Sequence, residues 1–187
     1  MRVFLALEIP GEVRTAIGEL IRTLEKTCRG AHWVRPDGVH VTLKFIGEAA
    51  PERIEQIQTR LANIRVSAPV ELEFRGVGFF PNDRHPRVFW AGIAATPNLA
   101  ELAGCIEREL APLGIPREER PFKPHLTLAR FKSEDGLPRL REAIASAGAL
   151  DFGAMREESF HLYGSRLKPG GAEYMKLATF PFTGAAR

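Results

Sequence analysis

The sequence predicts an α+β protein built as a bilobal, pseudo-symmetric duplication, with two antiparallel sheets facing a central cleft and helices outside. Three observations predict this fold. A repeat recurs at a constant offset, strand and helix patterns alternate within each copy, and both copies carry the same polar motif on a strand. We expect one domain over residues 1–187, with equivalent segments 2–43 and 87–128.

The repeat consists of two pairs of matching windows. Residues 2–6 and 87–91 are identical at four of five positions. Residues 35–43 and 120–128 are identical at five of nine positions. Both pairs share an offset of 85 residues (2 to 87, 40 to 125), without a gap. Unrelated chains of ordinary composition would give about one identity over these windows, so the two halves are similar by more than chance.

The first elements of each half follow in order. An apolar strand opens each copy, and apolar residues recur at helical spacing over residues 12–28 and 97–113. Gly30 and Gly114 are expected to end these helices. Each half therefore reads as strand, helix, strand.

The remaining elements extend this pattern. Residues 51–64 form a polar, amphipathic helix pattern, and residues 137–147 are its expected counterpart. Residues 70–80 alternate as a strand that ends at the turn Pro81-Asn82-Asp83. Two late strands are expected at residues 159–163 and 174–180, joined by a loop at 168–171.

Composition limits the class of protein. With 44% hydrophobic and 26% charged residues, the chain is globular rather than disordered. No apolar run approaches the roughly 20 residues of a membrane helix, and Glu8 interrupts the first one. We expect a cytoplasmic monomer without a membrane partner, in which Cys28 and Cys105 are reduced thiols. The net charge of +3 permits an anionic ligand.

The repeated motif is His-x-Thr-x, at His40 and Thr42 in the first half and at His125 and Thr127 in the second. Because strand side chains alternate, each His and Thr share one face. The apolar residues between them are expected to anchor each strand against the helices of its own half. The repeat then brings two imidazoles and two hydroxyls to one pocket.

This pair of histidines suits proton transfer. Imidazole titrates near pH 6.5, so one ring can act as a general base while the other acts as a general acid. Threonine hydroxyls donate hydrogen bonds to phosphate oxygens. A phosphodiester substrate fits this set. Neither motif has the spacing of a zinc site, which needs three protein ligands, so we expect no metal and no cofactor.

These motifs and their flanks resemble the 2H phosphoesterase superfamily, and within it the LigT-type RNA 2′,3′-cyclic phosphodiesterases, historically called 2′-5′ RNA ligases. The resemblance covers nearly the whole chain. It includes residues 2–7, 33–36, 40–47, 87–92, 124–130, 163–165 and 167–174.

The resemblance implies metal-free hydrolysis of RNA 2′,3′-cyclic phosphate ends to 2′-phosphates. It implies that His40 is the proton donor and His125 the proton acceptor, roles that the residues alone leave open. Thr42, Thr127 and Arg130 are the implied substrate-binding residues, and RNA or an oligonucleotide with a 2′,3′-cyclic phosphate end is the implied partner.

Strand alternation alone does not place every residue near the motifs. In an ideal strand Arg130 faces away from His125, so a bulge is needed to bring it to the phosphate. Lys44 breaks the same period and is expected in solvent. Phe45 and Phe80 either stack on a base or pack in the core. The remaining histidines are expected to be surface or hydrogen-bonded core residues; they are His32, His85 and His161.

Other functions use the same residues differently. A non-catalytic RNA-binding module is one alternative, although residues 75–80 match the RNP1 pattern poorly because Val77 stands where an aromatic residue should stack. The same site could join RNA ends through a 2′-5′ linkage. It could also act on a small cyclic nucleotide or an ADP-ribose derivative.

Overall fold

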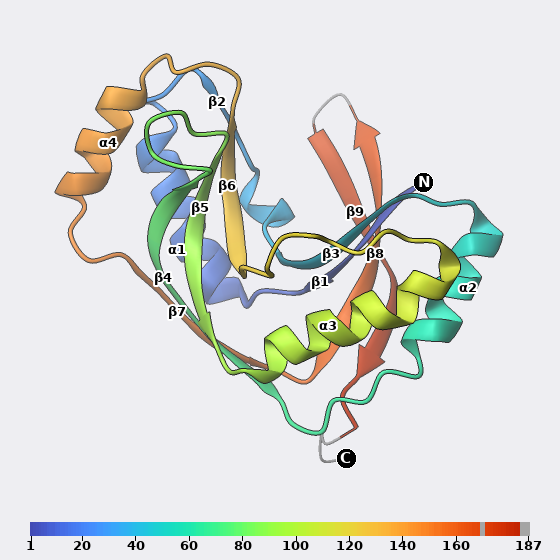
Figure 1. Ribbon diagram of the computed structural model, residues 1–187. Helices are drawn as coiled ribbons and strands as arrows, with labels where there is room; N and C mark the ends of the chain where they lie inside the picture. The colour runs from blue at the N-terminus through green and yellow to red at the C-terminus, as the bar shows by residue number, and fades with distance from the viewer. Residues whose placement is uncertain (169–170, 184–187) are drawn as a thin grey trace.

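A computed structural model describes residues 1–168 and 171–183 of the chain. In this part of the chain the strands form two antiparallel sheets that face each other, and helices lie on their outer faces (Figure 1). The α+β, two-sheet architecture expected from the repeat is confirmed.

Sheet A has four strands in the order β3-β1-β8-β9. Sheet B has five strands in the order β2-β6-β5-β4-β7. The strands of sheet A are β1 (Arg2–Leu7), β3 (Val41–Glu48), β8 (Ser159–Lys168) and β9 (Gly171–Pro181). Those of sheet B are β2 (Ala31–Trp33), β4 (Val70–Phe80), β5 (Val88–Ala95), β6 (His125–Phe131) and β7 (Asp151–Glu157). The motif strands β3 and β6 belong to different sheets and contact each other.

Two of the four described helices, α1 (Gly11–Leu24) and α3 (Asn98–Leu110), cross over to the other sheet. The others are α2 (Pro51–Leu61) and α4 (Leu137–Ser146), with short 3₁₀ turns η1 (Pro36–Gly38) and η2 (Ala111–Leu113). Helix α1 follows a strand of sheet A but packs against β7 of sheet B and against α4. Helix α3 follows a strand of sheet B but packs against β3 and α2. For β3, the expectation that the motif strand packs on a helix of its own half is therefore wrong, because its helix contact is with α3.

The core lies between each sheet and these helices. Val41, Leu43, Leu126 and Leu128, the apolar residues of the two motifs, are buried. Residues expected on the buried face of α1, such as Ile17, are buried as well. Burial of the apolar motif positions fixes both strands so that their polar residues face the cleft.

The predicted elements agree with the structure in type, with shorter or longer ends. Gly114 adopts a left-handed φ of 72° directly after η2, as a helix stop does. Gly30 is not a stop, because α1 already ends at Leu24. Strands β8 and β9 pair as expected, while residues 169–170 of the predicted loop lie outside the described residues.

Strand β7 is absent from the sequence prediction. Its buried residues are Phe152 and Met155, three positions apart rather than two. Pairing with β4 shifts register next to Gly153, which has a φ of 102°. This irregularity removes the alternation by which a strand is recognised.

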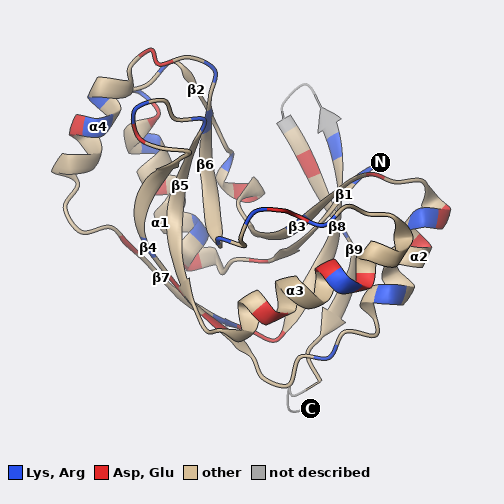
Figure 2. Ribbon diagram, in the orientation of Figure 1, with Lys and Arg blue, Asp and Glu red and all other residues tan. Residues whose placement is uncertain are grey.

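The charged residues are spread over the molecule. Acidic and basic residues alternate on the outer helices and on the segment between α3 and β6, which runs past β3 (Figure 2). None of the described helices combines the length and the apolar character that crossing a membrane requires.

Candidate active site

The two sheets meet at a pocket of about 310 Å³. The motif residues His40, Thr42 and Thr127 line it, together with Arg130. His125 is not among the lining residues, but it lies two positions before Thr127 on the same face of β6. The remaining lining residues include Arg2, Phe4, Val34, Phe45, Ser165 and Tyr174. The structure thus brings four of the five predicted site residues to one pocket and places the fifth beside it.

The two motif histidines are held in the same way. Nδ1 of His40 lies 2.8 Å from the carbonyl oxygen of Gly38, and Nδ1 of His125 lies 2.7 Å from that of Lys123. A carbonyl oxygen only accepts, so each Nδ1 carries the hydrogen and donates it. The neutral form of either ring then has an unprotonated Nε2. Both imidazoles are prepared to exchange a proton through Nε2.

His40 lies among aromatic rings. It stacks on Phe4 with ring centroids 4.6 Å apart, and Tyr174 meets it edge-on at 5.3 Å. Burial lowers the pKa of His40 to about 4, while the hydrogen bond to Gly38 opposes this shift. In the free protein at neutral pH, His40 is therefore neutral.

Phe4 and Tyr174 form walls of the pocket, a role that the sequence analysis did not predict. Phe4 lies on the cleft face of β1, since it pairs with Phe45 of β3. Its counterpart in the repeat, Phe89, lies in the core against Trp33. The repeat therefore does not predict which face Phe4 occupies.

His125 has a different aromatic neighbourhood. Phe80 meets its ring edge-on at 5.1 Å and lies 5.1 Å from Trp90. The indole of Trp90 lies across Gly78, where any Cβ would collide with it. Of the two alternatives for Phe80, base stacking or packing, its contacts favour packing around His125.

A β-bulge brings Arg130 to the pocket. Thr127 pairs with Trp90 and Ala129 pairs with Phe89, so the ladder with β5 skips Leu128. Leu128 and Ala129 are both buried, and the alternation resumes one position late. Arg130 consequently lies on the side of Thr127 and lines the pocket. This is the bulge that the sequence pattern required.

The equivalent bulge in β3 corrects the expectation for Lys44. The ladder with β1 skips Leu43, because Thr42 pairs with Ala6 and Lys44 pairs with Leu5. Lys44 is 7% exposed rather than solvated. Its Nζ lies 2.8 Å from both carboxylate oxygens of Glu107 and donates to the carbonyl of Pro116 at 2.8 Å. Lys44 thus ties β3 to helix α3.

The other histidines and the cysteines lie outside the pocket lining. His32 is exposed, and Nδ1 of the exposed His85 lies 2.7 Å from Glu134. His161 is buried, with Nδ1 3.0 Å from Oγ1 of Thr179. Cys28 and Cys105 are free thiols. Over residues 1–168 and 171–183, no group of three or more His, Cys, Asp or Glu side chains is arranged to hold a metal ion.

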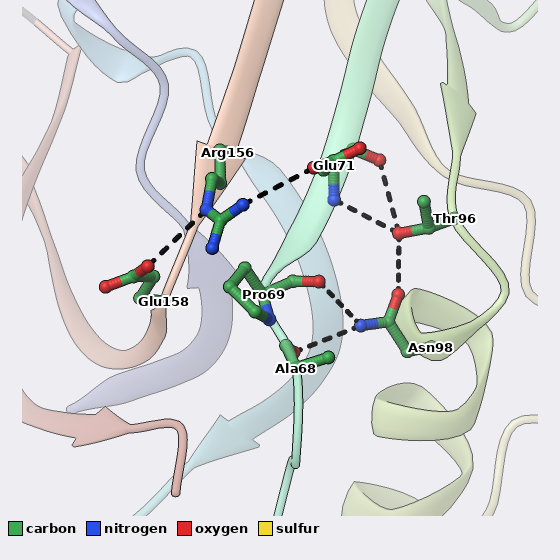
Figure 3. A network of polar contacts seen from close by, with 7 residues as sticks. All are labelled: Ala68, Pro69, Glu71, Thr96, Asn98, Arg156 and Glu158. Atoms are coloured by element: carbon green, nitrogen blue, oxygen red, sulfur yellow. Dashed lines mark hydrogen bonds and ion pairs between the residues drawn. The ribbon is translucent and has the colours of Figure 1, made fainter. Parts of the chain in front are cut away.

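A second, shallow groove lies on sheet B, and its charges are already paired. Arg156 lies 3.6 Å from Glu71 and 3.5 Å from Glu158 (Figure 3). In the same network, Thr96 donates to Asn98 at 2.6 Å. These pairs join β7 to β4 and fix the start of α3. The residues that line the groove do not include the histidine and hydroxyl set of the pocket between the sheets.

Comparisons with known proteins show which family the chain resembles over most of its length. The family model described as LigT like Phosphoesterase matches residues 7–90 and 93–174. A protein of Thermus thermophilus named RNA 2′,3′-cyclic phosphodiesterase is 38% identical, covering 98% of this chain and 91% of that protein. One of the same name from Archaeoglobus fulgidus is 33% identical, covering 96% and 99%.

Solved structures are similar to this chain over nearly its whole length. A crystal structure of a protein from Thermus thermophilus superposes with a TM-score of 0.82 at 34% identity, covering 100% of both chains. Escherichia coli LigT complexed with 3′-AMP superposes with a TM-score of 0.77 at 26% identity, covering 97% of this chain and 98% of that one.

Proposed function

This chain belongs to the LigT-like phosphoesterase family, and from that membership and its pocket we propose that it hydrolyses 2′,3′-cyclic phosphate ends of RNA to 2′-phosphate ends. The names of its relatives support this substrate. The observation that carries the proposal is the pair of Nδ1-anchored histidines at repeat-equivalent positions beside one pocket. Residues 1–187 would act as one domain in which segments 2–43 and 87–128 each supply half of the site.

The proposed reaction is an in-line displacement at phosphorus. Nε2 of His125 takes a proton from water as the water oxygen forms a bond to phosphorus. The bond from phosphorus to O3′ breaks, and Nε2 of His40 gives its proton to O3′. The product has a 2′-phosphate and a free 3′-hydroxyl, and the net change is the addition of one water molecule. The two histidines carry out both proton transfers in this scheme, and neither transfer requires a metal ion.

The surroundings of the two histidines support this division of roles. His40 lines the pocket and stacks on Phe4, where the ribose that bears the leaving oxygen would lie. His125 lies beside the pocket rather than within its lining, and it is partly exposed, so water can reach it. In this arrangement the nucleoside would contact His40, the proposed acid, and the attacking water would contact His125, the proposed base.

His40 must gain a proton before it can act as the acid. Its pKa of about 4 describes the pocket without an anion. A phosphodiester carries a negative charge, and an opposite charge within about 4–6 Å favours the protonated imidazole. Substrate binding would thus raise the pKa of His40, while the Gly38 carbonyl keeps its hydrogen bond to Nδ1.

Arg130, Thr42 and Thr127 would hold the phosphate. All three line the pocket from the two motif strands. The guanidinium can bind two nonbridging oxygens at once, and each hydroxyl can donate one further hydrogen bond. These contacts would orient phosphorus between the two Nε2 atoms and stabilise the charge of the transition state.

The test is hydrolysis of an RNA oligonucleotide that ends in a 2′,3′-cyclic phosphate, in the presence of EDTA. We expect the wild type to produce a terminal 2′-phosphate, which a 3′-specific phosphatase does not remove. His40→Ala and His125→Ala should each lose activity by a factor of about 10²–10⁴. His85→Ala is the matched control, because this exposed histidine pairs only with Glu134 among the described residues.

Two results would contradict the proposal. Tight binding of the oligonucleotide without turnover would indicate an RNA-binding module. Turnover that EDTA abolishes and zinc or manganese restores would indicate a metal-dependent reaction.

A further inference from the structure

We propose that His32 and Arg130 together bind a second phosphate of the substrate, the one that joins the terminal nucleotide to the rest of the RNA chain. This inference rests on the proposed function, because it concerns the part of the substrate that lies 5′ to the reacting phosphate. Such a contact would make the protein favour the end of a chain over a nucleoside cyclic phosphate.

The strand register places His32 next to Arg130. Strand β2 pairs with β6, and in this ladder His32 lies opposite Arg130 while Trp33 lies opposite Ala129. Residues that lie opposite each other in a ladder share one face of the sheet. Trp33 meets Phe89 edge-on in the core, with ring centroids 5.9 Å apart, and Ala129 is buried. His32 and Arg130 therefore lie on the other face, which carries the pocket.

The path of β2 supports the same placement of His32. Val34 lines the pocket, and His32 lies two positions before it. The backbone N–H of Val34 donates to the carbonyl of Leu128 at 2.8 Å, which extends the pairing of β2 with β6 by one residue. Because side chains alternate along a strand, His32 and Val34 share one side. Strand β2 is an edge strand of sheet B, so His32 lies at the rim of the pocket (Figure 1).

Over residues 1–168 and 171–183, neither His32 nor Arg130 has a hydrogen bond or an ion pair through its side chain. Both side chains are exposed. Arg2, another arginine that lines the pocket, instead donates to Glu48 at 3.2 Å. When the imidazole is protonated, two like charges lie directly opposite each other, which is destabilising. An anion that contacts both groups removes this repulsion.

The two halves of the molecule differ at this rim. Position 45 is the counterpart of position 130, 85 residues earlier, and it carries a phenyl ring in place of a guanidinium. Among the described residues, β3 is an edge strand of sheet A, whereas its counterpart β6 is bordered by β2. The first half thus supplies His32 to the sheet of the second half. The cationic pair lies on the Arg130 side of the pocket, and it would give the substrate chain one direction.

The covalent structure of the substrate fits this pair of groups. A cyclic phosphate end has its next phosphate on O5′ of the same ribose, one sugar away from the reacting phosphate. Neighbouring strands are about 4.8 Å apart, so the imidazole of His32 can reach a group beside the phosphate that Arg130 holds. A guanidinium has five N–H donors, enough to contact both phosphates, and the imidazole donates to the second. These contacts position the chain without reading its bases.

The test compares two small substrates. One is adenosine 2′,3′-cyclic phosphate with a 5′-hydroxyl, and the other is the same nucleotide with a methyl phosphodiester on O5′, which carries the single negative charge of an RNA linkage. Wild type should have the higher kcat/KM for the second substrate. His32→Ala should lower kcat/KM for the second substrate by about 3- to 10-fold, mostly through KM, because the contact is exposed to solvent. It should change kcat/KM for the first by less than about twofold.

Two variants serve as controls. His32→Arg keeps a donor and a positive charge, and it should retain the preference for the second substrate. His85→Ala changes an exposed histidine outside the pocket lining and should behave like wild type on both substrates. Equal losses of His32→Ala on the two substrates would overturn the inference, because His32 would then act at the reacting phosphate. No loss on either substrate would overturn it as well.

A binding measurement separates this inference from the proposed function. Calorimetry should show that wild type binds adenosine 2′,5′-bisphosphate more tightly than adenosine 2′-phosphate, and that His32→Ala narrows this difference. If this pattern is found but no protein hydrolyses the cyclic phosphate, the proposed function fails and the second phosphate site stands. If hydrolysis is normal and His32→Ala binds both ligands like wild type, the second phosphate site fails.

Discussion

The imidazole of His40 stacks on the phenyl ring of Phe4, with ring centroids 4.6 Å apart and an interplanar angle of 28°. This contact buries the imidazole and removes water that would otherwise solvate its charge. The pKa of His40 is about 4 as a result. The proposed acid is therefore neutral until an anion enters the pocket.

The first prediction concerns this titration. In the free protein, we expect nuclear magnetic resonance to give a pKa near 4 for His40. Saturation with a nucleoside 2′-phosphate, the product analogue, should raise this pKa, because the phosphate stabilises the imidazolium. A pKa that stays the same in the saturated protein would contradict protonation of His40 by substrate binding.

The second prediction is the effect of the same burial on stability. The pKa of His40 is about 4 when folded and near 6.5 when unfolded. Between these values the unfolded chain binds a proton that the folded protein does not, so the free energy of unfolding falls as pH drops from 6.5 to 4. The loss attributable to His40 is at most about 3 kcal/mol.

Urea unfolding at pH 7 and pH 4 would measure this effect. His40→Gln should show a smaller decrease in stability over this range than wild type. His85→Gln, which changes an exposed histidine, should decrease as much as wild type. Equal decreases in wild type and His40→Gln would show that His40 titrates normally in the fold.

The third prediction concerns Arg130. Arg130→Lys retains a positive charge but loses the planar fork that can bind two phosphate oxygens. We expect kcat/KM for a cyclic phosphate end to fall by about 10- to 150-fold, the equivalent of one hydrogen bond to a charged group. Arg130→Ala should lose more. If Arg130→Lys were fully active, a simple electrostatic role would replace the bidentate contact.

The fourth prediction concerns the threonines. Thr42→Val and Thr127→Val remove one hydroxyl each and preserve the β-branched shape of the side chain. Each should lower kcat/KM by about 10- to 150-fold. Both losses should be smaller than those of the histidine variants, which remove a proton-transfer group. A threonine variant as inactive as His40→Ala would contradict this ranking.

The fifth prediction concerns the ion pair between Lys44 and Glu107. Because the Lys44 side chain is only 5% exposed, removing its partner leaves an uncompensated buried charge. Glu107→Gln should destabilise the fold by about 3 kcal/mol. The double variant Lys44→Met with Glu107→Gln should be more stable than Glu107→Gln alone in urea unfolding. No recovery in the double variant would show that the charge of Lys44 is solvated.

The sequence predicted the two-sheet fold and the motif faces because both depend on local alternation that the repeat doubles. The bulge before Arg130 could be deduced from the sequence. The family resemblance places Arg130 at the phosphate, whereas in an ideal strand it would face away from His125. Lys44 was assigned wrongly, since its partner Glu107 lies 63 residues away on a helix of the other half. No local pattern reports such a contact.

The helix exchange and the position of Phe4 escaped prediction for related reasons. Helices α1 and α3 have similar apolar faces, and nothing in their periodicity states which sheet they cover. The match of residues 2–6 with 87–91 suggests equal faces, yet Phe4 faces the cleft and Phe89 the core. The register of strand pairing decides which face each residue takes. Thr42 lies opposite Ala6, whereas its counterpart Thr127 lies opposite Trp90, one residue before the counterpart of Ala6.

The most direct test of the central claim separates the acid from the base. It uses two substrates, a 2′,3′-cyclic phosphate end and a nucleotide 4-nitrophenyl phosphodiester, whose leaving group needs no proton. His40→Ala should lose about 10²–10⁴-fold on the cyclic phosphate yet stay within about tenfold of wild type on the nitrophenyl ester. His125→Ala should lose activity on both, because water must still be deprotonated. The reverse pattern, with activity on the ester kept by His125→Ala and lost by His40→Ala, would contradict the account.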